Sequence, residues 1–237
     1  MSQDIEEYKG YIINIDYDED PMNPREFFEP AATMVCWHSR YNLGDSESWK
    51  DSNGKRKSKQ LSDNYEESID LLYELAGVDR NEYQEQEHEK TGTWDDMTRD
   101  QLFKLIEEKG TIISSLYLYD HSGITISMGS FGCPWDSGQI GYIYMTKESI
   151  EKEGWTPEQA MKYMEGEVEV YDNYLTGEVY RYTIEDADGN EVDSCSGWYG
   201  DDGKEDMIKE CKSIIDHQVE KKHKRDLLLG IQIGLAL

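Results

Sequence analysis

The stretch that decides the fold reads TIISSLYLYDHSGITISMGSFGCPWDSGQIGYIYMT, residues 111–146. Its only charged side chains are Asp120 and Asp136, in a chain of which 32% of the residues are charged. Short runs rich in β-branched and aromatic residues alternate here with glycine-containing turns, a pattern typical of antiparallel strands. We therefore expect this stretch to form the heart of the core, with strands over Ile112–Tyr119, Ile124–Met128 and Ile140–Met145.

Helices are expected on both sides of this stretch. Apolar residues recur at helical spacing between Tyr65 and Gly77, and Thr98 and Thr156 each begin a capping box with Gln three residues later. We predict helices over residues 65–77, 98–110, 156–175 and 204–219. Further strands are predicted over residues 11–15, 32–37, 178–185 and 191–198, the last two joined by a turn at Asp188-Gly189.

This order of elements predicts an α+β fold with a mainly antiparallel sheet and helices packed on it. The length of 237 residues suits a single domain. We place that domain at residues 1–220, with a polar surface loop at residues 42–63, and treat residues 221–237 as a C-terminal tail.

The chain is strongly acidic, with 51 Asp and Glu against 24 Lys and Arg and a formal charge of −27. Phosphate contacts need clustered Lys and Arg, so direct binding of DNA or RNA is not expected. No apolar run reaches the ~18–20 residues of a membrane span, and Met1-Ser2-Gln3-Asp4 does not begin a signal peptide. We therefore expect a soluble cytosolic protein without membrane contact and without a cofactor.

Cysteine and histidine offer one alternative, a transition-metal site. The four cysteines lie far apart, so reduced thiols are expected instead of disulfides. Cys36 and His38, on one face of a strand, could join His121 and Cys133 from the core loops in a tetrahedral zinc site. The spacing does not require this site, and a buried thiol with a hydrogen-bonded histidine explains the same residues. The acidic run Asp16–Asp20 lacks the glycine and the bidentate Glu of a calcium-binding EF-hand loop.

The loop Phe131–Gln139 offers a candidate nucleophile. Cys133, with His121 as base and Asp136 to orient the ring, would form the set that nucleophilic catalysis requires. Pro134 follows the thiol and has no backbone N–H for an oxyanion hole, and Cys133 does not begin a helix that would lower its pKa. We therefore favour a non-enzymatic role and keep these three residues as an alternative catalytic set.

Acidic residues are dense in two stretches that we expect to be folded. Residues 61–100 hold 13 acids against 3 bases, and residues 147–210 hold 19 against 6, so the charge belongs to helices and a hairpin as well as to loops. A rigid surface of carboxylates resembles the field of a nucleic-acid backbone and attracts the basic channel of a nuclease, whereas simple solubility is the alternative explanation. The candidate contact residues are Asp63, Glu66, Glu67, Asp70, Glu165, Glu167, Glu169 and Asp172.

The tail combines a basic run, Lys221–Arg225, with an apolar end, Leu227–Leu237. A basic run followed by apolar residues is typical of segments that bind membrane surfaces, but anionic lipid would repel the rest of this acidic chain. We expect a final strand or helix that packs on the body or on a second copy. The tail is therefore a candidate homodimer contact.

Several strings resemble those of a family of uncharacterised phage and prophage proteins. They are Thr33–Asp45, Tyr117–Thr125, Cys133–Gly141, Tyr171–Tyr180, Asp193–Cys195 and Trp198–Asp202, and the resemblance spans about residues 12–202. It implies no catalytic residue. A phage origin implies an accessory protein acting inside the infected cell, by analogy with acidic phage inhibitors of restriction and of CRISPR nucleases.

The leading hypothesis is a phage protein of the host cytoplasm that inhibits a host nucleic-acid-dependent defence enzyme. It would bind the basic channel of a restriction or CRISPR nuclease through an acidic, nucleic-acid-mimicking surface. The alternative is a small enzyme, or a nucleotide- or metal-binding protein, with a Cys/His/Asp site in the loops of residues 120–139 and with Trp37 and Trp135 as walls. A structural or regulatory phage protein is the third hypothesis.

Overall fold

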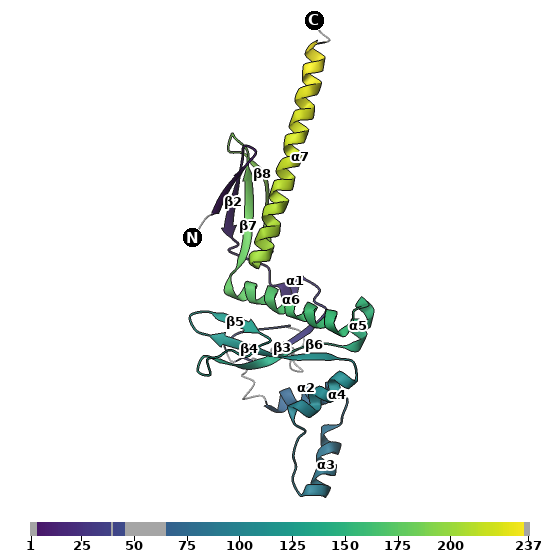
Figure 1. Ribbon diagram of the computed structural model, residues 1–237. Coiled ribbons are helices and arrows are strands. Elements are labelled where there is room, and N and C mark those ends of the chain that lie inside the picture. Colours follow the sequence, from purple (N-terminus) through teal and green to yellow (C-terminus); the bar gives the residue numbers. More distant parts are fainter. Residues whose placement is uncertain (1–3, 39, 46–64, 235–237) are drawn as a thin grey trace, which may run out of the picture. The chain divides into compact units, whose positions relative to one another are not determined.

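The computed structural model describes residues 4–38, 40–45 and 65–234 (Figure 1). These residues form antiparallel sheets with helices packed on them, which confirms the predicted α+β class. The contacts group the chain into two compact units: a central unit of residues 23–175, and a terminal unit of residues 1–22 and 176–237. The assignment of residues 1–220 to one domain stays a prediction.

The central unit is built on the stretch that the sequence placed at the heart of the core. Its strands are β3 (Thr33–Cys36), β4 (Ile112–Asp120), β5 (Ile124–Ser127) and β6 (Ser137–Met145). They follow the order β3-β6-β4-β5, and every neighbouring pair is antiparallel. β6 begins earlier than predicted because Ser137 and Gln139 pair with Tyr119 and Tyr117, beyond a register shift at Leu116/Tyr117.

Helices cover both faces of this sheet (Figure 1). The helices of the unit are α1 (Pro24–Phe27), α2 (Tyr65–Ala76), α3 (Arg80–Thr91), α4 (Arg99–Glu108), α5 (Lys147–Glu153) and α6 (Pro157–Thr176). α6 packs on one face, and α2 and α4 pack on the other. β3 shows the division, because Met34 and Cys36 join the cluster under α6 whereas Val35 joins the cluster under α2 and α4.

The terminal unit combines strands from both ends of the chain. They are β1 (Asp4–Tyr8), β2 (Tyr11–Tyr17), β7 (Val179–Glu185) and β8 (Glu191–Tyr199), antiparallel in the order β1-β2-β7-β8. α7 (Gly200–Gly234) packs on this sheet and buries Met207, Cys211 and Ile215 against it. From Glu220 to Leu228 every α7 residue is exposed, so the helix continues past its contact with the sheet (Figure 1).

Four elements were missed by the sequence pattern: β1, α1, α3 and α5. α3 is the clearest case, because it buries none of its residues and so has no apolar stripe to detect. The last helix was predicted to end at Val219, yet α7 continues to Gly234, so the described part of the tail is helical. Most of the predicted surface loop at residues 42–63 lies outside the described residues.

Candidate functional site

A polar pocket lies where the loop after β3 meets the loop that leads into β6. Its volume is about 470 Å³. Both tryptophans that were predicted as walls contribute to it: Trp37 is fully buried, and Trp135 is 92% exposed at the rim. The pocket is lined by Trp37, His38, Arg40, Leu118, Asp120, Trp135, Asp136, Ser137, Gly138, Gln139 and Ile140.

His38 is buried beside this pocket, and its ring stacks on the ring of Tyr41 with the two centroids 4.9 Å apart. Its Nδ1 accepts hydrogen bonds from the backbone N–H groups of Arg40 and Tyr41, at 3.3 and 3.2 Å, and an accepting nitrogen carries no proton. Burial and then the charge of Arg40 lower the pKa of His38, although the charge of Asp120 opposes them. His38 is therefore a neutral imidazole at neutral pH.

Cys133, His121 and Asp136 come together, but in an order that does not suit nucleophilic catalysis. The thiol of Cys133 and Nδ1 of His121 both approach the same oxygen, Asp136 Oδ2, at 3.7 and 3.4 Å. A catalytic thiol contacts the imidazole directly, because the ring must take its proton. Here the carboxylate stands between the thiol and the ring, so the geometry does not support the alternative catalytic set.

The alternative zinc set is dispersed. In the described ranges 4–38, 40–45 and 65–234, no three His, Cys, Asp or Glu side chains are grouped to hold a metal ion. Cys36 is buried in the cluster under α6, whereas the side chain of His121 is 63% exposed and that of Cys133 contacts Asp136. His38 uses Nδ1 for two backbone hydrogen bonds, as described above.

The eight candidate acidic contact residues do not form one surface. Glu66, Glu67 and Asp70 belong to α2, whereas Glu165, Glu167, Glu169 and Asp172 belong to α6; Asp63 lies outside the described residues. α2 and α6 cover opposite faces of the central sheet. A single flat contact therefore cannot include both sets.

Of the four candidate acids on α6, Glu165 and Glu169 are exposed. Asp172 has a structural role, because its Oδ1 accepts hydrogen bonds from the Thr125 hydroxyl and the Ile126 N–H, both at 2.7 Å. These bonds hold the end of α6 against β5. The carboxylate of Asp172 is thus engaged within the fold.

On the other face, Glu66 and Asp70 are organised by Arg80. Nη1 of Arg80 donates to both carboxylates, at 2.6 and 2.8 Å, while Nε and Nη2 donate to Asp96 at 2.8 and 2.6 Å. Asp96 first, and then Glu66 and Asp70, raise the pKa of Arg80 well above its ordinary value despite partial burial. One guanidinium thereby ties α2, the start of α3 and the segment before α4 together.

This arrangement creates an acidic layer, which we define as residues 66–108, comprising α2, α3, α4 and their connections. It holds fourteen Asp and Glu against four Lys and Arg, so its local charge is strongly negative. Glu82, Glu85 and Glu89 of α3 are exposed. Most of these acids lie on the three helices.

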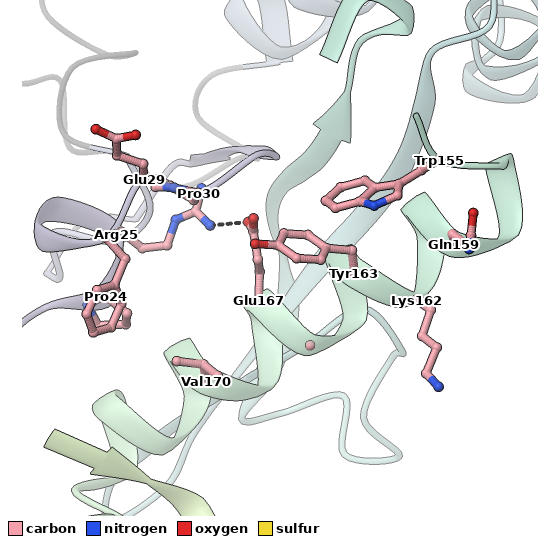
Figure 2. A pocket seen from close by; sticks show the side chains of 12 residues that line it. Pro24, Arg25, Glu29, Pro30, Trp155, Gln159, Lys162, Tyr163, Glu167 and Val170 are labelled. Atoms are coloured by element: carbon pink, nitrogen blue, oxygen red, sulfur yellow. Dashed lines mark hydrogen bonds and ion pairs between the residues drawn. The ribbon is translucent and has the colours of Figure 1, made fainter. Parts of the chain in front are cut away.

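An aromatic groove, which the sequence analysis missed, lies between α1 and α6 (Figure 2). Its volume is about 680 Å³, and the rings of Trp155 and Tyr163 meet there with centroids 4.4 Å apart. Pro24, Phe28 and Pro30 line it opposite α6. Phe28 and Tyr163 are 45% and 42% exposed, so the groove presents aromatic surface to solvent.

Arg25 closes one end of the groove with a buried network. Its side chain is 1% exposed. Nε and Nη2 donate to the two oxygens of Asp45 at 2.7 and 2.9 Å, and Nη1 donates to Glu167 at 2.5 Å (Figure 2). Glu167 also accepts a hydrogen bond from the N–H of Ala31 at 2.7 Å. Burial opposes the guanidinium charge, but Asp45 and Glu167 together raise the pKa of Arg25. Glu167 is therefore a structural residue.

Within the described residues, no helix has the length and apolar character to cross a membrane. Comparisons of the chain with protein-family models, with curated proteins and with solved structures give no match. The functional argument consequently depends on the acidic layer, the polar pocket and the aromatic groove themselves.

Proposed function

We propose that this protein is a phage accessory protein of the host cytoplasm that inhibits a host nucleic-acid-dependent defence enzyme of the restriction or CRISPR type. It binds the basic nucleic-acid channel of that enzyme through the acidic layer. The observation that carries the proposal is α3, which buries none of its residues and presents Glu82, Glu85 and Glu89 to solvent. α3 contributes only the partly buried Tyr83 to the cluster under α2 and α4, so most of its surface is available for an intermolecular contact.

The Arg80 network supports this role by holding the layer in place. The Arg80 side chain is 17% exposed and bonds to carboxylates of α2 and of the segment before α4, so α3 is fixed relative to α2 before a partner arrives. A preorganised surface loses less conformational entropy on binding. Dense carboxylates on a fixed surface also steer a basic partner, and salt weakens such steering.

The test is inhibition of DNA cleavage by a panel of restriction and CRISPR nucleases. We expect inhibition of at least one enzyme, falling steeply as NaCl is raised. Reversal of two exposed charges on α3, Glu85→Lys with Glu89→Lys, should remove it without unfolding the protein. The matched control is Glu205→Lys with Glu210→Lys on α7, which changes the net charge equally but leaves the layer intact. The proposal would be contradicted if both double variants lost inhibition equally, or if inhibition did not change with the NaCl concentration.

A second candidate function is binding of a small polar molecule, such as a nucleotide, in the polar pocket. The specific observation is that two indole rings line a cavity that also contains the Arg40–Asp120 ion pair. Planar ligands stack on exposed rings such as that of Trp135, and the charged pair supplies a donor and an acceptor.

Native mass spectrometry of the purified protein tests this candidate. A mass above the sequence mass that is lost on denaturation, and lost again in Trp135→Ala, would support it. Trp135 is almost fully exposed, so this substitution should leave the fold unchanged. Bare protein at the sequence mass, in a preparation with added nucleotides, would argue against it.

A further inference from the structure

The distal part of α7, Glu220–Leu228, combines basic and apolar side chains on one exposed segment. All nine residues are exposed. Four of the chain's 24 Lys and Arg fall within the five positions 221–225. Leu227 and Leu228 follow after Asp226 and are 59% and 62% exposed. This segment is thus a basic helix that ends in unburied leucines.

The aromatic groove has the complementary chemistry. Its walls include three aromatic side chains and two prolines, and eight exposed carboxylates against three exposed lysines lie on α1, the loop after it, α5 and α6. The eight are Glu26, Glu29, Glu148, Glu151, Glu153, Glu158, Glu165 and Glu169. Lys162 lines the groove but points away from the rings (Figure 2), and Arg25 is already bound to Asp45 and Glu167. The field at the groove is therefore negative, and its interior is apolar.

We propose that the aromatic groove of one copy binds the distal part of α7 of a second copy. Leu227 and Leu228 enter the groove, and the basic run Lys221–Arg225 lies against the surrounding carboxylates. Helices with an apolar face commonly bind in apolar grooves in this way, and matching charges fix their orientation. Both halves of the contact are surfaces that would otherwise leave large apolar side chains in water.

The inference does not depend on the proposed function. The groove lies on the α6 side of the central sheet, whereas the acidic layer lies on the side of α2 and α4. Loss of dimerisation can therefore be measured separately from loss of nuclease inhibition.

The first experiment is sedimentation equilibrium of the full chain at low salt. We expect twice the sequence mass for the natural protein and the sequence mass for Leu227→Glu with Leu228→Glu. Ser213→Glu with His217→Glu is the control, because it adds acids at exposed α7 positions nearer the sheet and should leave the dimer intact. A monomeric natural protein would overturn the proposal.

The groove itself is tested at Gly166. This α6 glycine lines the groove, and an added Cβ meets nothing within 4 Å, so a larger side chain fits the helix while filling the groove. We expect Gly166→Trp to be monomeric with an undiminished melting temperature. Gly166→Ala, which favours the helix but adds little volume, should remain dimeric.

A mixing experiment separates this contact from pairing of two α7 helices. Gly166→Trp keeps a natural helix, and the Leu227→Glu/Leu228→Glu variant keeps a natural groove. Each should be monomeric alone, and the mixture should form a 1:1 heterodimer through the one intact contact. A dimeric Gly166→Trp variant, or a mixture that stays monomeric, would overturn the assignment of the groove.

Discussion

Arg25 is the cation of a buried ion-pair network in the central unit. Its guanidinium is 1% exposed and is shared by Asp45 and Glu167, so replacement by Met leaves two carboxylates without their cation. Breaking a buried ion pair by removing one partner costs about 3–5 kcal/mol. We expect Arg25→Met to lose stability on that scale, measured by urea unfolding followed by circular dichroism at pH 7.

Arg25→Lys is the matched control for that variant. It keeps the positive charge but cannot form the paired hydrogen bonds to Asp45, so its stability should fall between those of the natural protein and Arg25→Met. If Arg25→Met unfolds at the same urea concentration as the natural protein, the ion pairs of Arg25 do not stabilise the fold as their geometry indicates.

His38 predicts a pH dependence of stability. Its folded pKa lies below the ordinary value of 6.5, so between these two values the unfolded chain binds a proton that the folded chain does not. The free energy of unfolding should therefore fall as the pH drops below about 6.5. His38→Asn supplies an acceptor oxygen in place of Nδ1 and has no titration there. Chemical unfolding at pH 7.5 and 5.5 should show that the natural protein loses more free energy of unfolding between these pH values than His38→Asn does. Equal losses in the two proteins would refute the assignment of this pH dependence to His38.

Single residues were predictable where chemistry gathers in neighbouring loops. Asp136, His121 and Cys133 are close in sequence and proved close in space, although in the wrong order for catalysis. Arg25 gave no such signal, because its partners are 20 and 142 residues away. Long-range ion pairs depend on topology, which local patterns do not contain.

At the scale of elements, Gly141 controls the pairing of β3 with β6. A Cβ at this position would lie 1.9 Å from the carbonyl oxygen of Val35, so no side chain fits without moving β3. We expect Gly141→Ala to destabilise the protein by about 3 kcal/mol, the upper range for overpacking. Thermal unfolding by calorimetry measures this.

Gly138→Ala is the control for that substitution. Gly138 lies in the same strand and is exposed, and an added Cβ meets nothing within 4 Å. Its melting temperature should stay close to that of the natural protein. Equal losses in the two variants would show that strand propensity, and not the approach of Val35, sets the cost.

The elements that were predicted correctly are those in which apolar residues recur at helix or strand spacing, or in which a helix cap is present. The capping box at Thr98 is present, with Gln101 accepting from the Thr98 N–H at 2.8 Å, and Thr156 forms the same bond with Gln159. α3 could not be found this way, because only Asp79 and Gly92 mark its ends. The spacing of the strands in the sequence also could not reveal that β2 pairs with β7. These two strands come together only after the long segment between them has folded.

At the scale of the molecule, a formal charge of −27 implies self-repulsion that salt relieves. Raising NaCl from 0.02 to 0.3 M shortens the screening length from about 20 Å to about 6 Å. We expect this screening to raise the free energy of unfolding by about 1 kcal/mol, which corresponds to about 2–4 °C in melting temperature for a chain of this size. Differential scanning calorimetry measures it, and a melting temperature that falls with salt would mean that attractive surface pairs dominate.

The pairing of β2 with β7 also has a consequence for synthesis on the ribosome. β1 and β2 emerge first, but their partner strand begins at Val179, about 160 residues later. At about 5–20 residues per second, the nascent hairpin waits roughly 8–30 s with Ile13 and Ile15 uncovered. The central unit, whose residues are contiguous, can fold during that wait. Translation that stops before β7 would release a folded centre carrying a β1–β2 hairpin whose β2 edge has no partner strand, the kind of product that chaperones and proteases recognise.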